Sequence, residues 1–181
     1  GGGAVAAAGL WGIMTKTSYM ATRLAIWKNP WDDGMNGRDK GFQIIQSLYA
    51  IGSGGLLGVG FGKSRQKFLY LPESENDYIF SIWCEEMGFV GAAIVILLFI
   101  LLVIRGYWIA VHARDRFGAL LVVGITTLTA VQVFLNIAVV TNLIPSTGIS
   151  LPFFSYGGTA LMIQLAEMGM VLSIDEAKFG K

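Results

Sequence analysis

The chain has 181 residues, of which 54% are hydrophobic and 14% charged, with a formal net charge of +1 at pH 7. Soluble domains rarely have this composition, which favours an integral membrane protein, and the near-zero charge argues against a nucleic-acid partner. Because Cys84 and His112 are each the single residue of their type, the chain can form neither a disulfide framework nor a His/Cys metal cluster.

The first half of the chain predicts the end of a helix followed by a long polar connection. Residues 1–14 are apolar but too short to span a bilayer, and they lack the basic start of a signal peptide. We therefore expect a helix that begins before the chain, and a chain that is the C-terminal part of a longer protein. Residues 15–76 form the connection. Within it, Gly41–Ala50 has helical spacing of apolar residues and predicts a short helix at the membrane surface, with an apolar face made of Phe42, Ile45, Leu48 and Tyr49.

A glycine-rich segment follows that helix. Six glycines in Ile51–Gly62 exclude an ordinary helix and indicate backbone that lies close to another element. The next residues, Lys63 and Ser64, suggest the end of a phosphate-binding loop. That motif needs a glycine at position 57, which is leucine, so we reject a nucleotide site.

The second half of the chain predicts membrane spans. Between Phe117 and Ala166 there is no charged residue or histidine, a run about twice the ~20 residues that one crossing needs. The predicted transmembrane helices are residues 78–104, 117–141 and 157–174, followed by a cytoplasmic tail at 175–181.

The charges between these spans predict their orientation. The short basic loop Arg105–Arg116 favours the cytoplasmic side. Residues 15–76 and the turn Asn142–Ser155 then lie outside. Because this turn is uncharged and contains Pro145 and Pro152, we expect it to be non-helical and packed into protein.

Five acids surround the start of the first of these spans. Charge at the edge of the hydrocarbon is expensive and is therefore usually functional. On a helix, Glu85 would lie about 80° around from Asp77 and Glu86 about 180° around, so only Glu85 could share a face with Asp77. Asp77 could act as a general base or could stabilise the helix N-terminus, and the residues leave both open. Glu85 and Glu86 could form a proton relay or pair with an arginine of a missing helix; the remaining acids are Glu73 and Glu75.

Basic side chains on the connection are candidates for contact with a pyrophosphate. On the residues alone, contact with anionic lipid head groups is the favoured alternative. The cations are Arg38, Lys40, Lys63, Arg65 and Lys67.

Four segments, in this order, carry a resemblance to a known family. They are YMATRLAIWKNPWDD (19–33), GFQIIQSLYAIGSGGLLGVGFG (41–62), SRQKFLYLPESENDYIFSIWCEEMGFVG (64–91) and IPSTGISLPFFSYGG (144–158). The chain resembles the SEDS family of membrane peptidoglycan polymerases, and the sequences of its motifs are more similar to the FtsW and SpoVE branch than to RodA.

The resemblance implies an all-α, polytopic helical bundle, the C-terminal part of a ten-helix fold in the bacterial inner membrane, with the catalytic loop on the extracytoplasmic face. It implies inverting glycosyl transfer between two lipid II molecules during division or sporulation. Asp77, in N-D-Y-I-F, matches the essential aspartate of the family and would be the base. The residues Ser-Glu-Asn before Asp77, and Tyr78 after it, depart from the family pattern. This departure predicts that the cavity around Asp77 differs locally from that of the family.

The resemblance also suggests what surrounds the base. Substrate contacts would come from Lys67, Arg65, Lys63, Arg38 and Glu73, and Glu75 and Glu85 would lie beside the base. The suggested cofactor is a divalent cation, Mg²⁺ or Mn²⁺, bound with the substrate pyrophosphate.

The implied partners are lipid II, a class B penicillin-binding protein transpeptidase, divisome proteins and membrane lipid. The chain alone is expected to be inactive, because part of the cavity is missing from it. Two alternatives stay open, a lipid II transporter (flippase) and a non-enzymatic scaffold for a transpeptidase. The transporter has less support, because the last two spans carry almost no charge.

Overall fold

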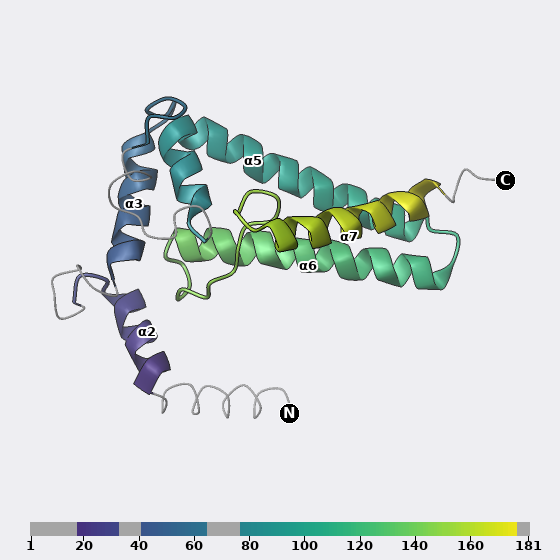
Figure 1. Cartoon of the computed structure of the whole chain (residues 1–181), viewed down its shortest axis with the longest axis horizontal. Coiled ribbons are helices and arrows are strands. Elements are labelled where there is room, and N and C mark those ends of the chain that lie inside the picture. The colour runs from purple at the N-terminus through teal and green to yellow at the C-terminus, as the bar shows by residue number, and fades with distance from the viewer. Residues whose placement is uncertain (1–17, 33–40, 65–76, 177–181) are drawn as a thin grey trace.

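A computed structural model describes residues 18–32, 41–64 and 77–176. These residues form helices and connecting turns, without a strand (Figure 1), which confirms the all-α prediction. The helices are α2 (Ser18–Lys28), α3 (Phe42–Gly54), α5 (Ile79–Val111), α6 (Arg116–Val140) and α7 (Gly158–Glu176). The predicted helix end at residues 1–14 and the acids Glu73 and Glu75 lie outside the described residues.

The two longest helices, α5 and α6, run side by side (Figure 1). Among the described helices, these two are long and apolar enough to cross a membrane, with mean hydropathies of 3.1 and 2.0. Gly106 of α5 allows the close approach, since a Cβ there would lie 2.4 Å from Oγ1 of Thr126. Large apolar side chains such as Leu98 and Leu101 stay more than half exposed, as expected for helices that face lipid or further helices.

The ends of these helices differ from the predicted spans. α5 continues seven residues beyond position 104 to Val111, so the predicted loop at 105–116 shortens to 112–115. The helix continues because the residues after Arg105 are mostly apolar, and Arg105 itself finds an ion-pair partner on α7. α6 begins at Arg116, where Oδ2 of Asp115 accepts a hydrogen bond of 2.7 Å from the Gly118 N–H and caps the helix.

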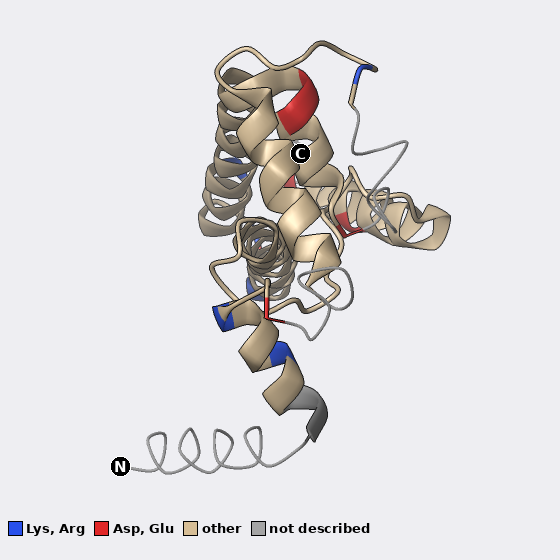
Figure 2. Cartoon of the chain, turned by 90° about the vertical axis from the view of Figure 1, so that its left-hand side faces the viewer, with Lys and Arg blue, Asp and Glu red and all other residues tan. Residues whose placement is uncertain are grey.

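Helix α7 begins one residue after the start of the last predicted span and ends two residues beyond its end. It is shorter and less apolar than α5 and α6, and it contains Glu167, Asp175 and Glu176. That α7 crosses the membrane stays a prediction. In Figure 2 the charged residues are few along the helices, and α6 has a single one, Arg116, at its first position.

Helix α3 packs against the first turns of α5 (Figure 1) and corrects one prediction. It extends to Gly54, four residues into the glycine-rich segment that was expected to exclude a helix. Of the predicted apolar face, Ile45 is buried, whereas Leu48 and Tyr49 are 39% and 51% exposed. That this face lies at the membrane surface stays a prediction. Gly54 allows the close approach of α5, since a Cβ there would lie 2.0 Å from the Cys84 carbonyl oxygen.

Candidate active site

Asp77 lies in the turn directly before α5 and is half-buried. The N-cap of α5 is Tyr78, whose side chain makes no capping hydrogen bond. Asp77 lies one residue before this N-cap, so the alternative of an acid that stabilises the helix N-terminus stays open beside the catalytic role.

A pocket of about 310 Å³ opens beside Asp77. The facing wall is the 148–157 part of the turn after α6, together with the first turns of α7. Hydroxyl and amide groups dominate the polar part of this lining, so the pocket suits a ligand rich in hydroxyl groups. The lining residues are Asp77, Gly148, Ser150, Leu151, Ser155, Tyr156, Gly157, Ala160, Leu161 and Gln164.

The wall opposite Asp77 is irregular backbone held by side chains. Phe153 has a left-handed φ of 65°, and its N–H donates to Oε1 of Gln164 at 2.8 Å. The N–H of Leu151 donates to Oγ of Ser155 at 2.7 Å. Leu151 is 1% exposed and Pro152 is also buried, whereas Leu143 is 67% exposed. The turn is non-helical, as expected, and its 151–152 part packs into protein.

Gly148 is a part of this wall that lies close to the carboxylate. Its φ is 70°, and a Cβ at this position would be 3.5 Å from Oδ2 of Asp77. The absence of a side chain keeps one side of the Asp77 carboxylate open to the pocket.

Asn136 of α6 connects the two walls, and the sequence analysis did not find it. Its Nδ2 donates to the carbonyl oxygen of Asp77 at 2.9 Å and to that of Ile149 at 2.8 Å. It is 1% exposed. An amide inside an apolar span was the signal that could have identified it, because buried polar groups need partners.

Helix α2 forms hydrogen bonds to the turn that follows α6. Nε1 of Trp27 donates to the carbonyl oxygen of Asn142 at 3.0 Å, and Nδ2 of Asn142 returns a hydrogen bond of 3.3 Å to Trp27. Arg23 donates to the carbonyl oxygen of Ser146 at 2.6 Å. Arg23 is thus a cation close to the pocket turn that was not among the predicted substrate contacts.

The glycine-rich segment meets α5 at a break in that helix. Gly88 has φ 67° and ψ −168°, which no α-helix contains. The carbonyl oxygens of Glu85 and Glu86 accept from the N–H groups of Val59 and Gly60 at 2.9 and 3.1 Å. Across the break, the N–H groups of Phe89 and Val90 donate to the carbonyl oxygens of residues 55 and 56. The predicted close backbone approach is confirmed, and the partner is α5.

The two glutamates of α5 lie at this break. Glu85 is 2% exposed and its Oε2 accepts a hydrogen bond from Oγ of Ser64, which is also 2% exposed. Neither Glu85 nor Glu86 is among the residues that line the Asp77 pocket. The structure thus places Glu85 with the glycine-rich segment rather than with the pocket.

Most of the predicted substrate contacts cannot be placed. Arg38, Arg65, Lys67 and Glu73, together with Glu75, lie outside the described residues. Lys63 is described and exposed, and does not line the Asp77 pocket. Within the described part of the chain, no group of three His, Cys, Asp or Glu side chains could hold a metal ion.

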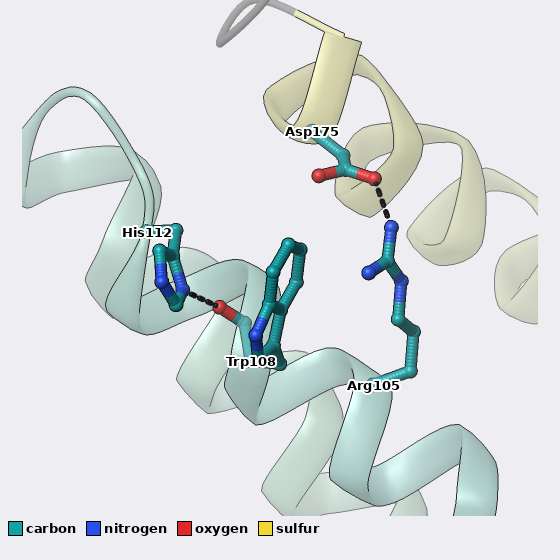
Figure 3. Close-up of polar contacts among 4 residues, drawn as sticks. All are labelled: Arg105, Trp108, His112 and Asp175. Carbon is teal, nitrogen blue, oxygen red and sulfur yellow. Dashed lines mark hydrogen bonds and ion pairs between the residues drawn. The ribbon is translucent and has the colours of Figure 1, made fainter.

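The opposite end of the α5–α6 pair holds a second polar cluster (Figure 3). Arg105 pairs with Oδ2 of Asp175 at 2.9 Å and lies over the Trp108 ring at 4.4 Å from its centroid. Nδ1 of His112 is 2.8 Å from the Trp108 carbonyl oxygen. This cluster joins α5 to α7.

These features define a class: a helical membrane protein with a half-buried acid at a polar pocket beside the end of its longest helices. The family model described as "Cell cycle protein", which groups FtsW, RodA and SpoVE, matches residues 3–179. The chain belongs to this family, so the resemblance predicted from its motifs is confirmed.

Curated relatives support this assignment. The chain is 48% identical over 172 residues to the stage V sporulation protein E of Bacillus subtilis, a match that covers 95% of this chain and 46% of that protein. It is 44% identical over 165 residues to a probable peptidoglycan glycosyltransferase FtsW of Geobacter sulfurreducens, covering 91% of this chain and 43% of that protein. The chain thus spans about half the length of these relatives.

Two solved structures are similar as well. One is described as "Structural coordination of polymerization and crosslinking by a peptidoglycan synthase complex"; it matches with a TM-score of 0.73 and 31% identity over 99% of this chain and 49% of that chain. The other is a mutant of the rod shape determining protein RodA of Thermus thermophilus, with a TM-score of 0.58 and 34% identity over 75% of this chain and 41% of that chain.

Proposed function

We propose that the full protein containing this chain is an inverting peptidoglycan glycosyltransferase that polymerises lipid II into β-1,4-linked glycan strands. The observation that carries the proposal is the position of Asp77, the residue that the family motif selects, beside a pocket with a hydroxyl- and amide-rich lining. Relatives named as probable peptidoglycan glycosyltransferases, at 44% identity over 91% of the chain, support it.

In this reaction Asp77 is the general base. Its carboxylate takes the proton from the 4-hydroxyl of the acceptor sugar as that oxygen attacks the anomeric carbon of the donor. The bond to undecaprenyl pyrophosphate breaks, and the pyrophosphate leaves with the bonding electron pair. A correctly placed general base contributes about 10²–10⁴-fold to the rate.

The pocket supports this role by its size and chemistry. At about 310 Å³ it is at the small end of ligand sites, which suits the acceptor sugar ring better than the whole lipid-linked substrate. The donor pyrophosphate would lie outside it, where Lys63, Arg65, Lys67, Arg38 and Glu73 remain the predicted contacts. The suggested divalent cation, Mg²⁺ or Mn²⁺, would arrive with that pyrophosphate.

The remaining proposals concern the surroundings of the reaction. The pocket end of the molecule lies on the extracytoplasmic face, where lipid II presents its sugars. The partner is a class B penicillin-binding protein, whose transpeptidase crosslinks the new strands within the divisome. A similar chain belongs to a complex described as coordinating polymerization and crosslinking, which supports this pairing.

The test uses the full reading frame that encodes this chain, purified with its partner, and measures glycan strands formed from lipid II. Asp77→Asn should lower the rate by about 10²–10⁴-fold, since the amide cannot accept the proton. Asp115→Asn is the matched control and should keep the wild-type rate, because asparagine caps α6 as well as aspartate does.

Two results would contradict the proposal in different ways. An Asp77→Asn protein that folds and keeps the wild-type rate would remove Asp77 from the role of base. A wild-type protein that moves lipid II across vesicles without polymerising it, and does so equally after Asp77→Asn, would favour the transporter instead.

A further inference from the structure

Asn136 is a buried amide that joins three separate parts of the molecule. It lies on α6, and its Nδ2 donates both to the turn that holds Asp77, 59 residues away, and to Ile149 in the turn after α6, 13 residues away. Both acceptors are backbone carbonyl oxygens. The two N–H bonds of the amide are therefore directed at irregular backbone rather than at a side chain.

Both acceptors border the pocket. Asp77 itself lines one wall, and Ile149 lies between Gly148 and Ser150, which line the other. The carbonyl oxygen of Asp77 is two bonds from the Cα that carries the side chain. Asn136 thus fixes the distance between the backbone of Asp77, from which the carboxylate projects, and the wall that faces it.

The hydrogen bonding of Asn136 is incomplete, which argues against stability as its main role. Its two N–H···O bonds each contribute modestly to folding. Oδ1 of Asn136 is buried without a hydrogen-bond partner among the described residues, and an unsatisfied buried acceptor lowers stability. The two effects oppose each other, so the definite effect of Asn136 is on geometry.

We propose that Asn136 is a positioning residue that holds the Asp77 carboxylate at the correct distance from the opposite pocket wall. This inference rests on the proposed role of Asp77 as general base. Asn136 does not touch the substrate; it acts through Asp77 and Ile149. A displacement of about 1 Å in such a constellation can lower a rate by up to ~10²-fold.

The test compares Asn136→Leu with Thr129→Val in the full protein. Leucine keeps the branched shape and the number of heavy atoms of asparagine but removes both donors. Thr129 lies on the same helix and is 4% exposed, and its hydroxyl donates to the carbonyl oxygen of Ile125 at 3.0 Å, so it controls for the loss of a buried hydrogen bond. The readouts are kcat and KM for lipid II polymerisation, and hydrogen–deuterium exchange of residues 77–81 and 148–151.

We expect Asn136→Leu to lower kcat by about tenfold or more with little change in KM, because the reacting group is misplaced while substrate contacts remain. Amide exchange should rise in both segments. Thr129→Val should change neither quantity. If Asn136→Leu does not fold, Asn136→Ser keeps one hydroxyl donor and should raise exchange in at least one of the two segments.

Wild-type kcat together with wild-type exchange in a folded Asn136 variant would overturn the proposal. So would an equal rise in exchange in Thr129→Val, since the effect would then be general to α6. Failure of the proposed function is seen separately, as a wild-type polymerisation rate in Asp77→Asn. The exchange measurement still decides whether Asn136 orders the two segments in that case.

Discussion

The two ends of the α5–α6 pair are held together in different ways. At the pocket end, buried side chains donate to backbone carbonyl oxygens: Asn136 to Asp77 and Ile149, and Ser47 of α3 to Val140 at 2.9 Å. At the opposite end, the contact between α5 and α7 includes an ion pair in which the Arg105 side chain is 56% exposed.

The difference reflects what each end must order. The pocket end contains irregular backbone, whose N–H and C=O groups need partners once they are buried. Fixed hydrogen bonds to these groups also fix the shape of the pocket. The opposite end joins regular helices, which satisfy their own backbone, and an exposed ion pair there contributes little. Substitutions at the two ends should therefore differ strongly in effect.

The largest loss of stability is expected from Gly88→Ala at the break in α5. The φ and ψ of Gly88 are nearly exclusive to glycine, and a Cβ would lie 2.4 Å from the Gly58 nitrogen and 2.6 Å from the Leu56 carbonyl oxygen. We expect a loss of roughly 2–4 kcal/mol, measured as a lower midpoint of thermal unfolding in detergent. Gly124→Ala, at a site with no atom within 4 Å, is the control and should leave the midpoint unchanged or slightly raised. Equal midpoints for both variants would show that the break tolerates a side chain.

An intermediate loss is expected from Ser64→Ala, two residues after the glycine-rich segment. The change removes a hydrogen bond to the side chain of Glu85, which is 2% exposed. Loss of a hydrogen-bond partner by a buried polar group lowers the free energy of unfolding by about 1–3 kcal/mol. Thermal unfolding checks this against Ser53→Ala. Ser53 is exposed and donates only locally, to the carbonyl oxygen of Ala50, so its loss should have an effect of ~0.5 kcal/mol or less. If the two serine variants unfold together, Ser64 does not support the break.

Hydropathy was enough to predict the long apolar helices, because a long uncharged segment in a bilayer must satisfy its backbone hydrogen bonds internally, as a helix does. It misplaced the end of α5, because Arg105 was taken as a loop residue. Its partner, Asp175, lies 70 residues away, and no local pattern reveals such a pairing. The burial of Ser47, Ala50 and Gly54 on α3 was missed for a related reason, since the packing of α3 against α5 and α6 buries these small residues.

The candidate site was predicted unevenly. Asp77 was found through a motif. The turn was found because it is uncharged and because it contains the helix-breaking residues Pro145 and Pro152. Asn136 was missed because its importance depends on two carbonyl oxygens that the fold brings to it. A side chain that orders distant backbone leaves only a weak signal in a single sequence, namely a polar group where apolar residues are expected.

The smallest effect is expected from Arg105→Gln at the end opposite the pocket. The change breaks the ion pair with Asp175 and the contact of the guanidinium with the Trp108 ring. Exposed ion pairs contribute about 0.2–1 kcal/mol, and exposed cation–π contacts contribute a similar amount. We therefore expect a small decrease in the unfolding midpoint that shrinks further at high salt, since screening weakens the wild-type pair. Lipid II polymerisation should stay at the wild-type rate, because the pocket lies at the other end of α5. A loss of polymerisation as large as that of Asp77→Asn would mean that the two ends are coupled, and the contrast between them would then not hold.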